Sequence, residues 1–155
     1  MTGRADKMLA DLKRAGLKLT PQRIAIVREL ADDPSHPTAQ ALYERLRPAF
    51  PTMSFATVYS PLDVLVDRGL TGSLNADPGS RAVRFDPNVE PHHHAICDAC
   101  GAVTDIPVAP SRALASSVPT LPGFRVLREE RTYRGLCQEC SAATEKIRTA
   151  KGERT

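Results

Sequence analysis

The chain of 155 residues has few large side chains: it contains no tryptophan, and aromatic residues make up only 5% of it. A chain of this size with so few bulky residues can form only a thin core, so a compact module built from it would benefit from an added cross-link such as a metal ion. No segment approaches the roughly 20 consecutive apolar residues of a membrane-spanning helix. The sequence therefore predicts no membrane partner.

Residues 1–16 also lack the apolar run of a secretory leader. We therefore expect a cytoplasmic protein whose four cysteines are reduced thiols rather than disulfides. The hydrophobic content of 41% and the charged content of 25% are typical of a globular chain rather than a disordered one. The formal net charge of +3 is compatible with a nucleic-acid partner but does not by itself indicate one.

The first half of the sequence predicts four helices, because apolar residues recur there at helical spacing. Thr20 followed by Pro21, and later Thr38 and Ser54, are residue types that begin helices. The predicted helices run from Ala5 to Ala15, from Pro21 to Asp32, from Thr38 to just before Pro48, and from Ser54 to Gly69.

Two short extended runs follow, Leu70–Leu74 and Ala82–Phe85, and turn-forming residues 75–79 join them. Several short helices followed by a hairpin are the layout of a winged helix-turn-helix domain. The fourth helix would then read DNA and the hairpin would be the wing. The same pattern also fits a helical interaction module without a DNA partner, because helices plus a hairpin are not specific.

Residues 87–91 are polar and include Pro87 and Pro91, which indicates a hinge between two domains, residues 1–86 and 92–155. The second half predicts strands at His92–Cys97, Ala102–Ile106 and Phe124–Leu136, a short helix near Ser111–Ser117 and a closing helix at Gln138–Thr149. We therefore predict an α+β protein with an N-terminal winged helix-turn-helix domain and a small C-terminal α/β domain.

All four cysteines lie in two CxxC pairs, Cys97 with Cys100 and Cys137 with Cys140. A two-residue gap lets both sulfurs of a pair reach one ion, and two pairs complete the closed Cys₄ shell of a structural Zn²⁺ site. Disulfides would need an oxidising compartment, and a single CxxC redox pair would leave the second pair unexplained. We expect the second domain to be lost when this zinc is removed.

The second candidate site begins with three consecutive histidines, residues 92–94. On a strand, the first and third would face one side, and Asp105 on the next strand could reach the same side. Adding Asp86 before the hinge and the upstream His36 gives a set of imidazoles and carboxylates that suits Fe²⁺, Mn²⁺ or Zn²⁺. The predicted set is His36, Asp86, His92, His94 and Asp105. The alternative is a solvated histidine run with ordinary carboxylates at strand ends.

Six motifs occur in order over nearly the whole chain: Leu19–Arg23, His36–Ala39, Ala56–Tyr59, Arg84–Asp86, His92–Gly101 and Gly135–Cys140. Together they resemble the motifs of the ferric uptake regulator (Fur) family of bacterial metalloregulators. The resemblance implies an N-terminal winged-helix DNA-binding domain, a C-terminal dimerisation domain and a homodimer on a palindromic operator. It also implies that the Cys₄ zinc is structural.

The regulatory ligands of the peroxide-sensing branch of this family, PerR, map onto the same five residues of the second candidate site. An aspartate at position 105 resembles that branch more than the iron-sensing branch, which usually has glutamate there. The resemblance implies a repressor that holds Fe²⁺ or Mn²⁺ (Zn²⁺ also fits) and is inactivated when peroxide oxidises His36 or His92. The alternative is an iron- or zinc-uptake repressor that responds to metal level only.

The expected DNA contacts are Lys18, Arg23, Thr57, Tyr59 and Ser60. The chain departs from the family after Tyr59, where a polar or basic residue is usual and this chain has Ser60 and Pro61. Ser60 removes a long side chain that could reach a base or a phosphate. A proline two turns into a helix removes a backbone hydrogen bond and can cost ~3 kcal/mol or kink the helix.

A metal-dependent enzyme that uses the His/Asp cluster is a further possibility from another class. The sequence offers no nucleophile and no cofactor motif for it, so we expect no catalysis and no small-molecule substrate. The expected partners are double-stranded operator DNA and a second copy of the chain.

Overall fold

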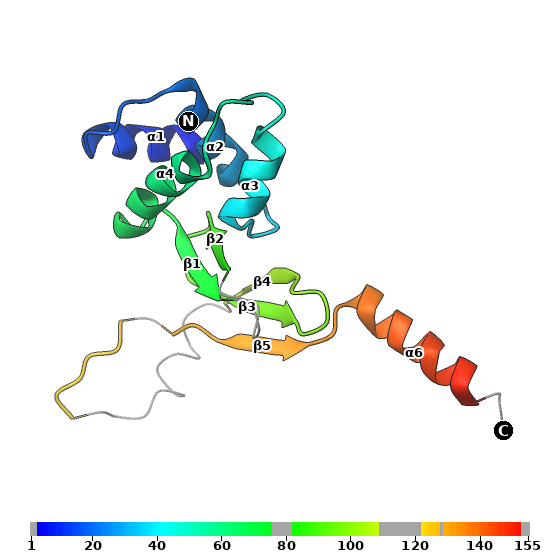
Figure 1. The fold of residues 1–155 in the computed structure, drawn as a ribbon. Coiled ribbons are helices and arrows are strands. Elements are labelled where there is room, and N and C mark those ends of the chain that lie inside the picture. Colours follow the sequence, from blue (N-terminus) through cyan, green and yellow to red (C-terminus); the bar gives the residue numbers. More distant parts are fainter. Residues whose placement is uncertain (1–2, 76–81, 109–121, 128, 153–155) are drawn as a thin grey trace. The chain divides into compact units, whose positions relative to one another are not determined.

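The computed structural model describes residues 3–75, 82–108, 122–127 and 129–152 (Figure 1). The chain divides into two compact units, Met1–Val89 and Glu90–Thr155. None of the described helices is both long enough and apolar enough to span a membrane.

The first unit contains all four predicted helices followed by a two-stranded hairpin. Its elements are α1 (Arg4–Arg14), α2 (Pro21–Ala31), α3 (Ala39–Leu46), α4 (Phe55–Asp67), β1 (Gly72–Asn75) and β2 (Val83–Asp86). The predicted helix starts are confirmed, since the side chains of Thr20, Thr38 and Ser54 each accept a hydrogen bond from the backbone N–H three residues on.

One hydrophobic core joins the four helices and the hairpin. Its buried members come from every helix, and Phe85 adds an aromatic ring from β2. They are Met8, Leu12, Ile26, Val27, Leu30, Ala31, Ala39, Leu42, Leu46, Met53, Val58, Leu62, Leu65, Leu70 and Phe85. The apolar stripes that predicted the helices are therefore the surfaces that pack together.

Helix α4 continues through Pro61, as the predicted range from Ser54 to Gly69 requires. Pro61 is buried on the same side as Val58, Leu62 and Leu65, at the spacing of one helical face. The proline ring thus takes a position in the apolar stripe, and its burial offsets part of the cost of the missing backbone hydrogen bond.

Strands β1 and β2 pair antiparallel, with Gly72 opposite Asp86. The predicted hairpin is confirmed with its strands shifted by one or two residues, and positions 76–79 of its predicted turn lie outside the described residues. The other side of β2 is also occupied: the Phe85 N–H donates to the Pro37 carbonyl, and Thr38 forms an isolated bridge with Arg84. The segment before α3 is therefore bonded to the wing.

The second unit contains a three-stranded sheet in the order β4-β3-β5 and a C-terminal helix. Its elements are β3 (His92–Cys97), β4 (Val103–Pro107), β5 (Thr132–Gly135) and α6 (Gln138–Gly152). Strand β3 pairs antiparallel with β4 and parallel with β5. The helix predicted near residues 111–117 lies outside the described residues.

The prediction of one long strand from Phe124 to Leu136 was wrong, because only residues 132–135 form a strand. In the register of the parallel pair, His94 lies opposite Thr132, so the start of β3 lies opposite residue 130. Residues 124–127 and 129 therefore lie beyond the start of β3 in this register, and none of them pairs with a strand among the described residues. A pattern of alternating residues cannot show where the partner strand stops.

Candidate metal centres

The four cysteines come together at one end of the second sheet. Cys97 ends β3, Cys100 lies in the following turn, Cys137 follows β5, and Cys140 lies in the first turn of α6. The parallel register places Cys97 opposite Gly135, which brings the two CxxC pairs to the same end of the sheet. All four sulfur atoms lie within 4.8 Å of one another.

The spacing of the sulfur atoms fits a tetrahedral zinc ion. The Sγ atoms of Cys100 and Cys137 are 3.8 Å apart. Zn–S bonds of about 2.3 Å at tetrahedral angles place neighbouring sulfurs about 3.8 Å apart. Gly101 adopts a positive φ of 69° in the first turn, and its N–H donates to the Cys97 carbonyl at 2.8 Å. This turn lets the chain fold both sulfurs of the first pair toward one point.

The pKa values of the thiols differ sharply within the cluster. The backbone N–H of Cys137 donates to the Cys97 sulfur at 3.3 Å, and this bond, with that of the Cys100 N–H, lowers the pKa of Cys97 to about 6. Hydrogen bonding with the thiols of Cys137, Cys100 and Cys97 raises the pKa of Cys140 to about 12. The lowered pKa of Cys97 favours its thiolate at neutral pH, whereas Cys140 must release a proton to bind a metal ion.

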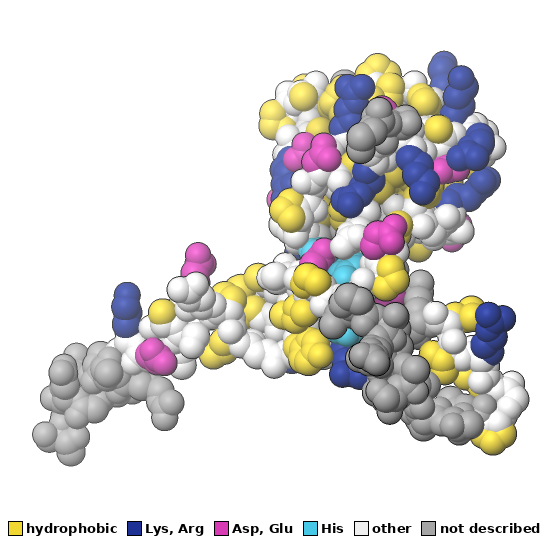
Figure 2. Space-filling model, turned by 180° about the vertical axis from the view of Figure 1, so that it is seen from behind, with side chains coloured by type: hydrophobic (Ala, Val, Ile, Leu, Met, Phe, Trp, Pro, Cys, Tyr) yellow, Lys and Arg dark blue, Asp and Glu magenta, His cyan; other side chains and the backbone are white. Residues whose placement is uncertain are grey.

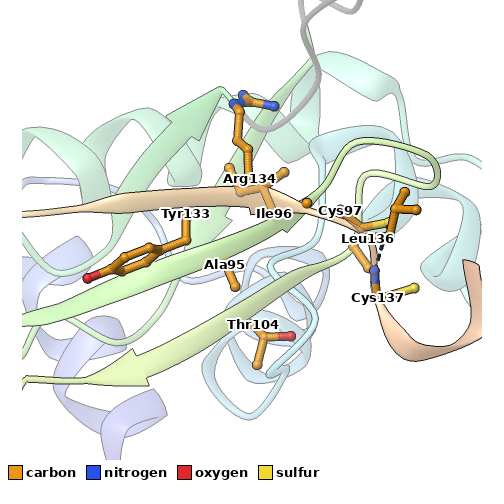
Figure 3. A pocket seen from close by; sticks show the side chains of 10 residues that line it. Ala95, Ile96, Cys97, Thr104, Tyr133, Arg134, Leu136 and Cys137 are labelled. Atoms are coloured by element: carbon orange, nitrogen blue, oxygen red, sulfur yellow. Dashed lines mark hydrogen bonds between the residues drawn. The ribbon is translucent and has the colours of Figure 1, made fainter. Parts of the chain in front are cut away.

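A groove of about 240 Å³ lies on one face of the same sheet (Figure 3). Residues of all three strands line it, among them Ala95, Thr104 and Tyr133, and it reaches Cys97 and Cys137. Because side chains alternate along a strand, His92 and His94 project from the opposite face. The sheet thus lies between the groove and the side chains of His92 and His94.

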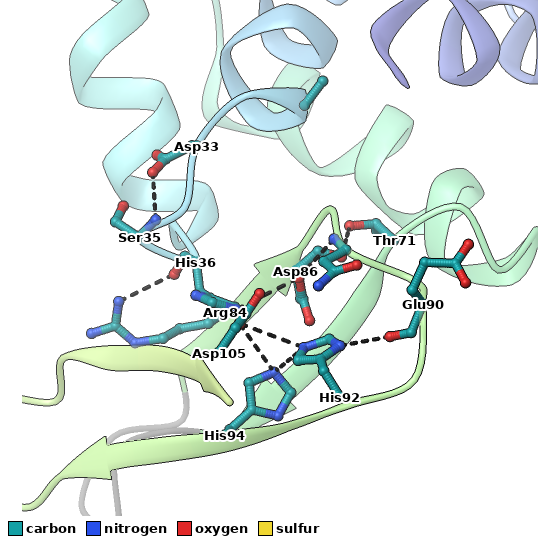
Figure 4. A network of polar contacts seen from close by, with 12 residues as sticks. Asp33, Ser35, His36, Thr71, Arg84, Asp86, Glu90, His92, His94 and Asp105 are labelled. Atoms are coloured by element: carbon teal, nitrogen blue, oxygen red, sulfur yellow. Dashed lines mark hydrogen bonds and ion pairs between the residues drawn. The ribbon is translucent and has the colours of Figure 1, made fainter. Parts of the chain in front are cut away.

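Three of the predicted regulatory ligands form a cluster on that opposite face (Figure 4). Asp105 of β4 lies directly across from His94. The Nε2 atoms of His92 and His94 are 2.9 Å apart, and Asp105 Oδ1 lies 3.5 Å from the first and 3.9 Å from the second. Metal–nitrogen bonds of about 2.1 Å at right angles would place two ligand atoms about 3.0 Å apart, so the donor atoms are spaced as ligands of one ion.

A backbone contact fixes which nitrogen of His92 can act as a ligand. His92 Nδ1 lies 2.7 Å from the Glu90 carbonyl oxygen, which can only accept a hydrogen bond. Nδ1 therefore carries the proton, and in the neutral ring Nε2 presents its lone pair toward His94 and Asp105. This is the arrangement that metal-ligating histidines usually have.

The other two predicted ligands, His36 and Asp86, lie together in the first unit. They are 1% and 3% exposed, and His36 Nε2 lies 3.6 Å from Asp86 Oδ1. The Asn88 N–H donates to the Asp86 carboxylate at 2.8 Å, and the Thr71 hydroxyl donates to its carbonyl at 2.7 Å. Both Asp86 groups are thus oriented by fixed partners.

Each unit therefore carries its own group of nitrogen and oxygen donors, and the second also carries the thiolates. The donor chemistry confirms the prediction of two kinds of metal cofactor, a structural zinc ion and a regulatory divalent ion. The assignment of individual residues as ligands stays a prediction.

The predicted DNA contacts all lie in the first unit. Lys18 and Ser60 are exposed, Tyr59 is 39% exposed, and the Thr57 hydroxyl is within 2.9 Å of the Ser54 hydroxyl. Arg23 has a structural partner, because its guanidinium donates to the Lys18 carbonyl at 2.8 Å. Figure 2 shows Lys and Arg side chains spread over this unit.

Sequence reasoning missed Phe55 as a residue of this surface. Its ring is 38% exposed and packs edge-to-face against Tyr59 at 5.0 Å and Tyr43 at 5.6 Å. No local signal distinguished it, because Phe55 lies three residues before Val58 and seven before Leu62, which is the spacing of the buried face of α4.

Residues 14–131 match the ferric uptake regulator family. The chain belongs to the ferric uptake regulator family. A curated relative in Staphylococcus aureus (strain Mu50 / ATCC 700699), the peroxide-responsive repressor PerR, is 36% identical over 135 residues, which is 87% of this chain and 90% of that protein.

Two solved structures show the same fold. PerR from Streptococcus pyogenes has a TM-score of 0.51 at 29% identity and covers 89% of this chain and 93% of that one. The ferric uptake regulator from Pseudomonas aeruginosa with manganese has a TM-score of 0.64 at 25% identity. The match covers 84% of this chain and 98% of that one. The predicted fold class, an N-terminal winged helix-turn-helix domain with a small C-terminal α/β dimerisation domain, is confirmed. The chain is a metal-responsive regulator of the Fur family.

Proposed function

We propose that this Fur-family protein is a repressor that binds palindromic operator DNA as a homodimer in the cytoplasm and leaves it in response to peroxide. The observation that supports this proposal is that each unit holds a group of neighbouring imidazole and carboxylate side chains. The first unit holds His36 and Asp86, and the second holds His92, His94 and Asp105. Mixed imidazole and carboxylate donors suit Fe²⁺ or Mn²⁺, with Zn²⁺ as a further candidate. In this proposal the five residues hold one regulatory ion.

The proposed switch follows from the division of the ligands between the units. A ligand that binds one arrangement of the units better than the others shifts the population toward it by its differential affinity. The favoured arrangement would hold two copies of α4 about 34–36 Å apart, as two half-sites of a palindrome require. The proposed DNA contacts are Lys18, Arg23, Thr57, Tyr59 and Ser60.

The proposed response to peroxide is supported by the similarity to the Staphylococcus aureus relative, which is a peroxide-responsive repressor. In this proposal a bound Fe²⁺ ion would supply the chemistry that cleaves the O–O bond of peroxide. The imidazole of His36 or His92 would be oxidised by two electrons: it would gain one peroxide oxygen, the other would leave as water, and that residue would cease to be a ligand. Cys97, Cys100, Cys137 and Cys140 would hold the structural zinc and take no part in sensing.

The homodimer is supported by the composition of the second unit's surface. Among its described residues, Phe124, Leu127, Tyr133, Leu136 and Ile147 are between 47% and 82% exposed. Exposed apolar side chains in such number are typical of a surface that another chain covers.

Mass spectrometry after peroxide treatment of the Fe²⁺-loaded protein tests the sensing mechanism. We expect one added oxygen on the peptide that contains His36 or His92, together with loss of operator binding; the Mn²⁺-loaded protein is the matched control and should gain none. His93 is an internal control, since it alternates with His92 along β3. Release of DNA by chelation alone, with no added oxygen, would support an iron- or zinc-uptake repressor instead.

A further inference from the structure

The segment between α2 and α3 holds His36 in an unusual backbone conformation. His36 has a φ of 53°, the one positive φ at a non-glycine position among the described residues. Side chains other than glycine avoid this region because the β-carbon crowds the backbone. The conformation therefore persists only if the surrounding residues hold it.

Both ends of the segment are anchored. On the N-terminal side, the Asp33 carboxylate accepts a hydrogen bond from the Ser35 N–H at 2.7 Å and is itself paired with Arg45 of α3. On the C-terminal side, the Pro37 carbonyl accepts from the Phe85 N–H at 2.9 Å. These contacts fix the neighbours of His36 but not His36 itself.

Arg84 supplies a contact to His36 itself. Its guanidinium donates to the His36 carbonyl at 3.2 Å, and the side chain is half-buried (Figure 4). Arg84 lies two residues before Asp86 on β2, so both side chains project from the same face of that strand. One strand face therefore holds the backbone of His36 and also presents the carboxylate that its ring approaches at 3.6 Å.

We propose that Arg84 is a positioning residue for metal binding, which rests on the proposed role of His36 as a ligand. By holding the His36 carbonyl, Arg84 keeps the backbone in the positive-φ conformation that directs the imidazole toward Asp86. The planar guanidinium presents several N–H donors in a rigid arrangement, which suits it to hold a carbonyl in one position. Loss of an outer-shell partner of this kind typically weakens metal affinity by about 10–100-fold.

This role also links the ligand segment to the wing. Arg84 belongs to the strand that ends in Asp86, so an ion held by His36 and Asp86 would be fastened to β2 through both a side chain and a backbone contact.

The test is a Co²⁺ titration of the zinc-containing full-length protein in competition with a chromophoric chelator. We expect Arg84→Gln to raise the Co²⁺ dissociation constant about 10-fold, and Arg84→Lys to fall between Gln and wild type because one ammonium donor can replace part of the contact. Arg28→Gln, an exposed arginine on α2, is the matched control and should leave the constant unchanged.

The His36→Ala background separates positioning from general stability. If Arg84 acts through His36, Arg84→Gln should add no further weakening once the imidazole is gone. Equal weakening in both backgrounds, or wild-type affinity for Arg84→Gln in a folded protein, overturns the proposal. If His36→Ala itself leaves Co²⁺ binding unchanged, the ligand set of the proposed function is what fails.

Discussion

The two units of this chain are held together in different ways. The first has a continuous core to which four helices and the wing contribute fully buried apolar side chains, such as Leu12, Leu30 and Leu62. Among the described residues of the second, the buried apolar side chains are Ile96, Cys97 and Val103. Hydrophobic packing therefore accounts for the first unit, whereas the described part of the second has few buried apolar side chains, as a unit that relies on the proposed zinc ion and the proposed dimer would have.

The difference between the two units predicts that removal of the zinc ion unfolds the second unit but leaves the first one folded. A structural zinc site can contribute ~10–16 kcal/mol of apparent binding free energy, more than the whole stability of most small domains. The few buried apolar side chains among the described residues of the second unit could not replace a contribution of that size. The first unit has no cysteine and should keep its structure when the zinc is removed.

Replacing Cys140 with serine should have the largest effect, because a hydroxyl cannot take the place of the fourth thiolate. We expect loss of zinc and unfolding of the second unit, with the first unit still folded. Backbone amide NMR measures both units at once: amides of β3 to β5 should lose their dispersed signals while those of α1 to α4 keep them. Ser141→Ala is the control, and a zinc-free protein with a folded sheet would contradict the prediction.

Truncating Leu62 to alanine should be the next largest effect and should act on the first unit. Leu62 is completely buried in α4, and leucine-to-alanine changes at such positions destabilise by about 2–5 kcal/mol. Urea unfolding of the zinc-loaded protein, followed by helical circular dichroism, gives the change in unfolding free energy. Val64→Ala, at a half-buried position of the same helix, should cost less; equal costs would argue against the described core.

Tyr133→Ala should weaken association of the second unit with its copy. Tyr133 is 47% exposed on β5 and lines the groove of the sheet. If the partner covers this face, removing an aromatic ring there should cost about 2 kcal/mol, or roughly 30-fold in the dimer dissociation constant. Sedimentation equilibrium measures that constant, with the neighbouring Thr132→Ala as control. An unchanged constant would place the dimer contact elsewhere.

Asp33→Asn should have the smallest effect, and it should depend on pH. Burial alone would raise the pKa of Asp33, but hydrogen bonds from Ser35 and Arg45 outweigh it and leave the pKa below the ordinary 3.8. The ionised carboxylate therefore stabilises the first unit above about pH 4, and this contribution is lost as the pH falls through the lowered folded-state pKa.

Because Arg45 is 43% exposed, solvent screening limits this contribution to about 1 kcal/mol or less. Urea unfolding at pH 7 and at pH 3 should show a wild-type advantage at pH 7 that shrinks at pH 3. A difference between wild type and variant that stays constant over this range would show that the carboxylate charge is not what stabilises the segment.

The features that could be predicted from the sequence depend on local signals. The helix starts at Thr20, Thr38 and Ser54 are set by side chains that bond backbone groups three residues away. The cysteine cluster was predictable because spacing within each CxxC pair decides which sulfurs can share an ion.

The features that could not be predicted depend on partners distant in the chain. The bounds of β5 depend on its pairing with β3, and the contact of Arg84 is to a backbone carbonyl that any residue at position 36 would offer. The net effect of Pro61 on α4 is not readable from the sequence for a similar reason: it depends on the side chains that surround its ring, and the local rule for proline does not include them.

The parallel pairing of β3 with β5 has a consequence for how this chain can vary. The register fixes Cys97 opposite Gly135 and so brings the ends of the long connection from Cys100 to Cys137 together, whatever lies between them. The entropic cost of closing such a connection rises by only about 0.6 kcal/mol for each doubling of its length. Insertions and deletions between β4 and β5 should therefore be tolerated more readily than changes within β4, which carries Asp105, or within β5, which sets the register.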